Sequence, residues 1–126
     1  GADRLAWRGR SADPFAELAQ ALRRFADERD WDRFHAPKNL AMALSVEAAE
    51  LLEHFQWLGE EESKRLSPEK LAQVGEEMAD VLLYLVRLAD KLGIDLAQAA
   101  RRKMRVNAQK YPAHLAHGSR RKYTEL

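Results

Sequence analysis

Apolar residues recur along this chain at intervals of three and four, which is the spacing of one face of an α-helix. No stretch shows the alternation of apolar and polar residues that is typical of a half-buried strand. The pattern predicts four helices, over about residues 14–30, 38–57, 68–92 and 96–111. The intervening residues 31–37 break the periodicity, and the acidic residues 59–65 are expected to form a loop. The chain is therefore predicted to be an all-α protein, a four-helix bundle.

Capping residues and prolines mark the ends of these helices. Asp-Pro at 13–14 and Ser-Pro at 67–68 each join a good N-cap to a proline that suits the first helical position. Gly93 is expected to end the third helix, since glycine readily adopts the left-handed conformation of a helix C-terminus. Asp95 should cap the fourth helix, and Pro112 should end it, since the residue before a proline avoids helical geometry.

The composition is that of an ordinary globular domain. The chain has 126 residues, of which 46% are hydrophobic and 33% charged, and its formal net charge is +1. Neither a nucleic acid nor a membrane is expected as a partner. No repeat or linker divides the sequence, so one domain is predicted over residues 1–126, with a helical core at about 13–111 and a polar tail at 112–126. The first residues lack the pattern of a secretory leader, and a cytoplasmic location is expected.

The third predicted helix is apolar on more than one side. Leu83 and Val86 point away from its main apolar arc, which consists of Leu71, Val74, Met78, Val81, Leu85 and Leu92. A helix that is apolar nearly all round over residues 81–86 is expected to be buried from several directions. In so short a chain, another subunit can bury the side of this helix that the chain itself leaves exposed. A homo-oligomer is therefore predicted, either a dimer or a tetramer.

Four carboxylates occupy unusual positions on the second and third helices. Glu47 falls in the middle of an apolar face and Glu50 at its edge, while Glu77 and Asp80 border the apolar arc of the next helix. Residues three apart are neighbours on a helix surface, so packing of the two helices would bring all four together. Buried unpaired carboxylates are strongly unfavourable. Basic residues, protons or a divalent cation could neutralise them, and oxygen ligands without cysteine suit Mg²⁺ or Mn²⁺.

The positions of these four carboxylates by themselves leave two interpretations open, a solvated helix face and a metal site. A single E-x-x-E pair usually marks a solvated helix face, whereas two pairs on successive helices favour a metal site. Di-iron bundles also use facing carboxylates, but they require Glu-x-x-His on two helices. Here His54 follows Glu50 by four residues rather than three. A di-iron centre is therefore disfavoured.

A carboxylate-bound cation of this kind often completes its coordination with substrate phosphates, which predicts a phosphorylated ligand. Aromatic side chains could bind the base of a nucleotide, since aromatic faces stack on bases. The candidates for this role are Trp31, His35, Trp57 and Tyr84. Core packing is the alternative role for Trp31 and Trp57. Lys103, Asn107 and Lys110 could bind phosphate oxygens, or they could simply lie on a solvated helix face.

The paired motifs E-x-x-E at 47–50 and E-x-x-D at 77–80 resemble the metal-binding signature of the all-α MazG-like nucleoside triphosphate pyrophosphohydrolases. Longer segments resemble the dCTP pyrophosphatase branch of that family, and the likeness runs from about Phe15 to the C-terminus. These segments are ERDWDRFHAPKNL at 28–40, HFQWL at 54–58, DVLLYLV at 80–86 and RKYTEL at 121–126.

The resemblance implies an enzyme that cleaves dCTP or a modified dCTP between the α and β phosphates, giving the monophosphate and pyrophosphate. It implies a dimer or a dimer-of-dimers tetramer with a shared pocket. It assigns Mg²⁺ to Glu47, Glu50, Glu77 and Asp80. The substrate-binding residues that we expect are Trp31, Asp32, Arg33, Phe34, His35, Asn39, Trp57, Tyr84, Lys103 and Asn107.

One position departs from the family pattern. Leu22 stands where the dCTP enzymes place a nucleotide-contacting histidine, so a different or broader set of triphosphates becomes plausible. A carboxylate, Glu47 or Glu50, is expected to be the general base. Glu47 is preferred because its core-facing position should raise its pKa. The rival to an enzyme is a non-catalytic helical interaction module, whose acidic residues only cap, pair or bind a partner.

Overall fold

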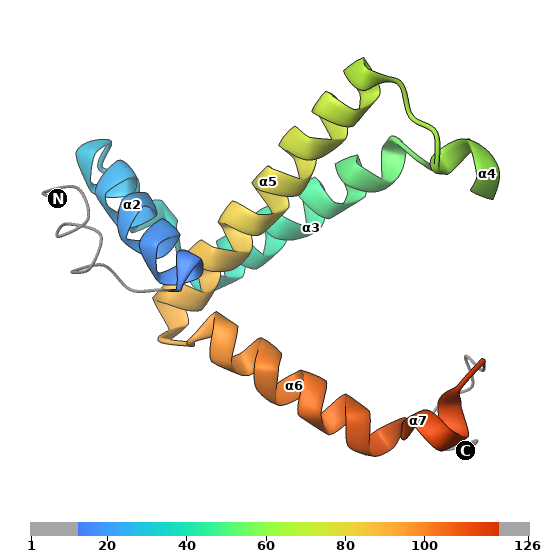
Figure 1. The fold of residues 1–126 in the computed structure, drawn as a ribbon. Helices are drawn as coiled ribbons and strands as arrows, with labels where there is room; N and C mark the ends of the chain where they lie inside the picture. Colours follow the sequence, from blue (N-terminus) through green and yellow to red (C-terminus); the bar gives the residue numbers. More distant parts are fainter. Residues whose placement is uncertain (1–12, 119–126) are drawn as a thin grey trace, which may run out of the picture. The chain divides into compact units, whose positions relative to one another are not determined.

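A computed structural model describes residues 13–118. The described chain is helical and contains no strand, which confirms the all-α prediction (Figure 1). Its elements are α2 (Pro14–Glu28), the 3₁₀ turn η1 (Asp32–Phe34), α3 (Pro37–Glu53), α4 (Glu60–Ser63), α5 (Pro68–Leu92), α6 (Leu96–Lys110) and α7 (Ala113–Ala116). Within residues 13–118, none of these helices is both long and apolar enough to cross a bilayer. The RKYTEL segment lies outside the described residues.

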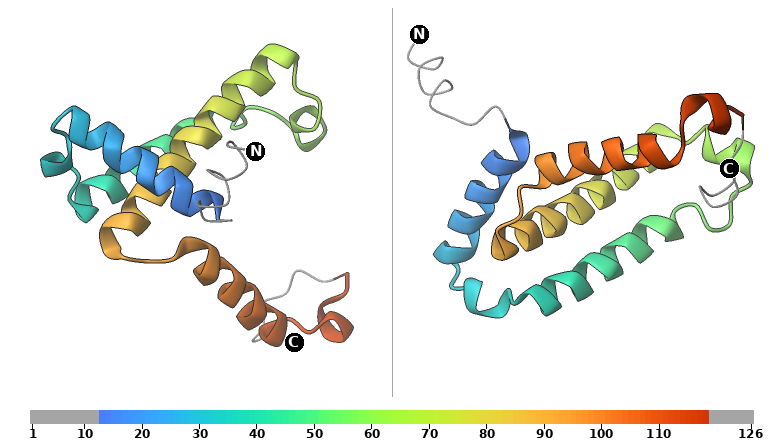
Figure 2. Two further views of the ribbon diagram at one scale, coloured as in Figure 1. Left: turned by 60° about the vertical axis from the view of Figure 1, so that its left-hand side comes forward. Right: turned by 90° about the horizontal axis from the view of Figure 1, so that it is seen from below.

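The chain forms two compact units, one that ends at Ile94 and one that begins at Asp95. In the first unit α3 and α5 run antiparallel, side by side, and α2 packs against α5 (Figures 1 and 2). The turn η1 connects α2 to the start of α3. The second unit contains α6 and α7. A single domain with a complete four-helix bundle stays a prediction.

The capping predictions are confirmed. The side chains of Asp13, Ser67 and Asp95 accept first-turn backbone N–H bonds of 2.9, 3.2 and 3.0 Å, respectively. These bonds satisfy donors that a helix N-terminus otherwise leaves without partners. Gly93 ends α5 in the left-handed conformation, with a φ of 69°. Local sequence therefore determines where α5 begins and ends.

Helix α3 is shorter than the prediction of 38–57, since it ends at Glu53. The following residues make tighter bonds: the N–H groups of His54 and Phe55 donate to carbonyls three residues back, at 3.2 and 2.9 Å. Such bonds satisfy the last carbonyls of a helix and let the chain turn away. Trp57 therefore lies beyond α3 rather than on it.

The prediction of an acidic loop at 59–65 was also wrong, because residues 60–63 form α4. Three glutamates occupy its first turn, where negative charge interacts favourably with the helix dipole. Glu62 also accepts a 3.2 Å bond from the backbone N–H of Gly59. In the tail, Ala113–Ala116 forms a further short helix.

The apolar arc predicted on α5 is only partly covered in this chain. Val74 and Val86 are buried, whereas Leu71 and Met78 are each 56% exposed. Within residues 81–86 only Val86 is fully buried, and the rest are half-buried. An apolar arc that remains open to solvent in one chain offers a surface to a second chain.

Candidate active site

The antiparallel pairing of α3 and α5 brings acidic side chains of both helices together. One carboxylate oxygen from each of Glu47, Glu77 and Asp80 lies within 4.8 Å of the other two. Oε2 of Glu47 and Oε2 of Glu77 are buried, and neither has a hydrogen-bond partner within the described part of the chain. Buried carboxylate oxygens are normally paired or bound to a cation. These two oxygens are therefore suited to bind a cation.

Glu50 lies next to this group. Its pKa is raised, first by hydrogen bonding with Glu47 and then by the charge of that residue and by burial, while Glu77 acts in the opposite direction. Glu50 thus interacts with both neighbouring glutamates, although it is not one of the three residues whose oxygens converge most tightly. All four carboxylates singled out in the sequence meet in one region of the first unit.

The pKa of the Glu47 carboxyl is raised as well. The first cause is the side-chain interaction with the neighbouring carboxyl group of Glu77. Burial and repulsion by Glu77 and Asp80 add to this rise, whereas the side-chain interaction with Glu50 lowers the pKa. The pKa of Glu47 is therefore raised, as the sequence analysis predicted. The neighbouring Glu77 contributes more to this rise than burial does, whereas the prediction relied on burial.

The donor set fits a hard divalent cation. All the converging atoms are carboxylate oxygens, and nitrogen and sulfur ligands are absent from this group. Mg²⁺ and Mn²⁺ favour such ligands, whereas softer metals favour imidazole or thiolate. A cation bound here would neutralise the two orphaned oxygens. The residues present therefore fit a divalent metal, and the identity of the ion is part of the proposal below.

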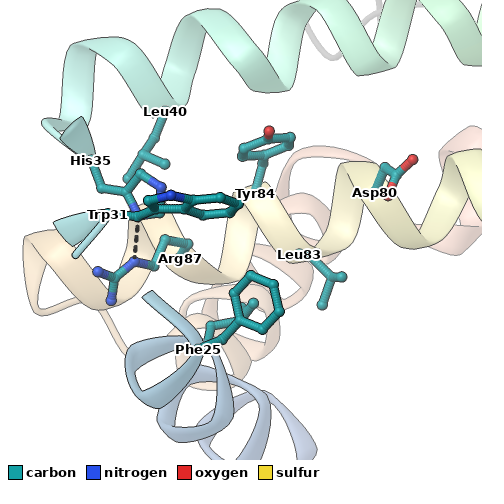
Figure 3. Close-up of a pocket in the computed structure, with 9 residues that line it drawn as sticks. Phe25, Trp31, His35, Leu40, Asp80, Leu83, Tyr84 and Arg87 are labelled. Atoms are coloured by element: carbon teal, nitrogen blue, oxygen red, sulfur yellow. Dashed lines mark hydrogen bonds between the residues drawn. The ribbon is translucent and has the colours of Figure 1, made fainter. Parts of the chain in front are cut away.

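A pocket of about 190 Å³ adjoins the acidic cluster. Asp80 belongs to both, since it lines the pocket and also supplies an oxygen to the cluster. Figure 3 shows Asp80 at one end of the pocket and the His35–Arg87 pair at the other, with aromatic rings between them. The residues that line the pocket are Leu22, Phe25, Trp31, His35, Leu40, Asp80, Leu83, Tyr84 and Arg87.

Three of the predicted substrate-binding residues, Trp31, His35 and Tyr84, line this pocket. Trp31 meets the edge of the Phe25 ring, with ring centroids 5.7 Å apart and planes at 68°. The apolar walls could hold a planar heterocycle. Leu22 also lines the pocket, so the departure from the family pattern falls where it would contact a bound base.

The other predicted residues of the WDRFH segment, and Asn39 just after it, lie outside the pocket lining. Arg33 pairs with Asp30 at 3.3 Å, and its guanidinium lies 4.8 Å from the ring centroid of Phe34. Asn39 donates a 3.2 Å bond to the carbonyl of Phe34. Asp32 accepts bonds from two basic residues of α5. The structure gives these residues structural contacts, and their predicted contacts with substrate stay predictions.

The remaining predicted substrate residues are not among those that line the pocket. Trp57 is 88% exposed and lies four residues beyond the end of α3. Lys103 and Asn107 lie on α6, in the second unit, and both are exposed. No role for these three residues follows from the first unit by itself.

Arg87 is the charged pocket residue that the sequence analysis missed. It is 3% exposed and lies two turns of α5 beyond Asp80, on the same face. The signal was present in VLLYLVRLA at 81–89, where one charged residue interrupts an apolar run. The reasoning that singled out Glu47, a charge on an apolar helix face, applies equally to Arg87.

Known proteins resemble this chain over most of its length. The sequence model of the MazG-like family matches residues 42–126. Human dCTP pyrophosphatase 1 is 49% identical over 119 residues, which cover 92% of this chain and 70% of that protein. The bovine dCTP pyrophosphatase 1 is 46% identical over 119 residues, with the same coverage of 92% and 70%. A crystal structure of a pyrophosphatase from Archaeoglobus fulgidus superposes with a TM-score of 0.75 at 43% identity, covering 82% of this chain and 96% of that one.

Proposed function

This chain belongs to the MazG-like family, and we propose that it is a nucleoside triphosphate pyrophosphohydrolase. The observation that carries the proposal is the double role of Asp80, which joins a carboxylate cluster to an aromatic pocket. A nucleoside triphosphate has the matching arrangement, with an anionic end that needs a cation and a planar base that favours apolar walls. The similar dCTP pyrophosphatases and the pyrophosphatase from Archaeoglobus fulgidus support the same reaction class.

The finer proposal is Mg²⁺-dependent cleavage between the α and β phosphates, with Mn²⁺ as the other candidate ion. Glu47, Glu50, Glu77 and Asp80 are the residues that would hold the metal. A bound divalent cation would polarise phosphoryl oxygens and lower the pKa of a bound water. Glu47 is the proposed general base, since a raised pKa makes its carboxylate a stronger proton acceptor.

The proposed substrate is dCTP or a modified dCTP, on the strength of the curated relatives. Leu22 in the pocket favours a second candidate, a broader house-cleaning activity on other non-standard triphosphates. A leucine offers apolar contact where a histidine would offer a hydrogen bond, so discrimination between bases should be weaker. A cytoplasmic location and the absence of a nucleic-acid partner stay predictions.

Pyrophosphate release from a panel of triphosphates tests the proposal directly. We expect release in the presence of Mg²⁺, none with EDTA, and faster release from dCTP and 5-substituted dCTP than from other canonical triphosphates. Glu77→Gln should abolish release because Glu77 carries one of the orphaned oxygens. Glu76→Gln is the matched control, since Glu76 is the exposed neighbour on the same helix.

The possible results separate the candidates. A flat ranking across modified triphosphates would favour the house-cleaning enzyme over the dCTP enzyme. Failure to release pyrophosphate from any triphosphate would instead favour the non-catalytic interaction module. Equal loss of activity in Glu76→Gln and Glu77→Gln would contradict the assignment of the cluster.

We also propose that the chain is a homo-oligomer, either a dimer or a tetramer. The support is the exposed part of the apolar arc of α5, where Leu71 and Met78 are each more than half exposed. Light scattering after gel filtration should give a mass of two or four chains. The double variant Leu71→Glu, Met78→Glu should dissociate the assembly, because it places charge in an apolar interface. Gln73→Glu, on an exposed polar position of α5, should not.

A monomeric mass for the wild-type chain at micromolar concentration would contradict the proposed assembly. An intact oligomer in the double variant would instead place the interface on another surface.

A further inference from the structure

The buried cation of the pocket, Arg87, is the starting point. Its guanidinium is 3% exposed, in a stretch of α5 that is otherwise apolar. Arginine stays protonated in proteins, and a buried charge needs partners with good geometry. The groups that Arg87 contacts therefore indicate what this residue is for.

Arg87 reaches across from α5 to the segment between α2 and α3. One terminal nitrogen donates to Asp32 Oδ1 at 2.6 Å, and Nε donates to His35 Nδ1 at 3.2 Å. Its other terminal nitrogen lies 3.6 Å from Asp90, a neighbour on the same helix. Asp32 is the first residue of η1 and His35 directly follows this turn. One guanidinium thus holds both ends of η1 against α5.

These contacts determine the protonation of His35. A guanidinium has only donors, so the atom it contacts, Nδ1 of His35, must be an acceptor. A neutral imidazole carries one proton, which must then sit on Nε2. Nε2 donates to no other residue of the described chain, and His35 lines the pocket (Figure 3). The donor on Nε2 is therefore available to a ligand.

We propose that Arg87 is a positioning residue that holds His35 as the neutral tautomer protonated on Nε2, which then donates a hydrogen bond to an acceptor atom of the base in the pocket. This inference rests on the proposed function, since it presumes a nucleotide there. The favoured ligand is a heterocycle with a ring nitrogen or carbonyl oxygen toward His35. A ring that turns an N–H to this position leaves two donors facing each other, which costs affinity.

Burial of His35 and the charges around it also favour the neutral form of its imidazole. Burial lowers the pKa of His35, and so do the positive charges of Arg87 and Lys91, while Asp32 opposes them. The imidazolium form, which would place a proton on Nδ1 facing Arg87, is therefore disfavoured. Burial in the pocket and the positive charge of Arg87 therefore both favour a neutral imidazole ring.

Nitrogen-15 NMR of the histidine ring tests the assignment without reference to turnover. In wild type the long-range correlations of His35, assigned by their loss in His35→Gln, should show a protonated Nε2 and a bare Nδ1. Arg87→Met should shift these signals toward a mixture of tautomers. Lys91→Met is the matched control, since Lys91 pairs with the same Asp32 at 2.9 Å but does not contact His35. It should leave the tautomer unchanged.

Kinetics provides the second readout. Arg87→Met should raise KM for dCTP about tenfold or more, as expected for a lost hydrogen bond in a buried site, with kcat changed only a few-fold. Lys91→Met should change neither value by more than a few-fold. If Arg87→Met does not fold, as judged by circular dichroism, Arg87→Lys replaces it. A lysine keeps the positive charge, but its single ammonium group cannot donate to Asp32 and His35 with the geometry of a guanidinium, so KM should still rise.

Two results would overturn the inference even in an active enzyme. One is a proton on Nδ1 of His35 in wild type, and the other is an equal rise in KM for Arg87→Met and Lys91→Met. Absence of pyrophosphate release from every triphosphate would refute the proposed function, and the NMR tautomer would still decide whether Arg87 positions His35.

Discussion

Replacing Glu47 by glutamine is expected to lower kcat for pyrophosphate release by about 10²–10⁴-fold, the range that general-base catalysis supplies. Glutamine retains a carbonyl oxygen of similar size at the same place, but it cannot accept a proton at neutral pH. The measurement is steady-state release of pyrophosphate from dCTP at saturating substrate and a series of Mg²⁺ concentrations.

The Mg²⁺ series separates the two roles proposed for Glu47. A loss that persists at saturating Mg²⁺ indicates a base, whereas recovery at high Mg²⁺ indicates that Glu47 is only a ligand. Glu53→Gln is the control, since Glu53 is an exposed residue at the end of the same helix. A kcat for Glu47→Gln within a few-fold of wild type would contradict the assignment of the base.

Mg²⁺ is expected to stabilise the folded protein strongly in the absence of any nucleotide. The orphaned oxygens of Glu47 and Glu77 repel each other in the metal-free protein, and a cation would relieve this repulsion. Ligand linkage sets the size of the effect: at 100 times the dissociation constant, binding adds about 2.7 kcal/mol to the free energy of unfolding. Thermal unfolding at increasing Mg²⁺ measures it.

The stabilisation should depend on pH with a definite sign. The pKa values of Glu47 and Glu50 are raised above the ordinary 4.5, so the metal-free fold holds more protons than the unfolded chain. Its free energy of unfolding should therefore fall as pH rises from about 4.5 through the raised pKa values. Mg²⁺ binds the deprotonated carboxylates, so its contribution should grow over the same interval.

Glu77→Gln supplies a matched test of this account. Removal of one charge should make the metal-free protein at least as stable as wild type, and it should reduce the shift that Mg²⁺ produces. Glu76→Gln should retain the full shift. An Mg²⁺ shift of equal size in both variants would show that the ion binds elsewhere, and no shift in wild type would argue against a metal site.

The sequence by itself determined the helices and most of their ends. Signals such as Ser67 before Pro68, and Gly93 after α5, act within one turn of chain, so they hold whatever packs nearby. The helix ends that the sequence analysis predicted wrongly also have local causes. His54 and Phe55 end α3 through bonds to carbonyls three residues back. Three glutamates begin α4 in what resembled a loop.

The sequence also contained the acidic residues of the site, since a carboxylate on an apolar helix face is visible from spacing. It could not show which oxygens would converge. The antiparallel register of α3 and α5 decides that Glu47, Glu77 and Asp80 come closest, with Glu50 beside them. Register depends on side-chain packing between segments distant in sequence, which helical periodicity does not encode.

Only the tertiary structure revealed the other end of the pocket. Arg87 lies 52 residues beyond His35 and 55 beyond Asp32, and nothing in local sequence links them. Their contact exists because η1 packs on α5. The same packing turns Trp31 and His35 into the pocket while Arg33 and Asn39 make contacts elsewhere. Residue type thus predicted the chemistry of the WDRFH segment, but backbone packing decided which of its side chains face the ligand.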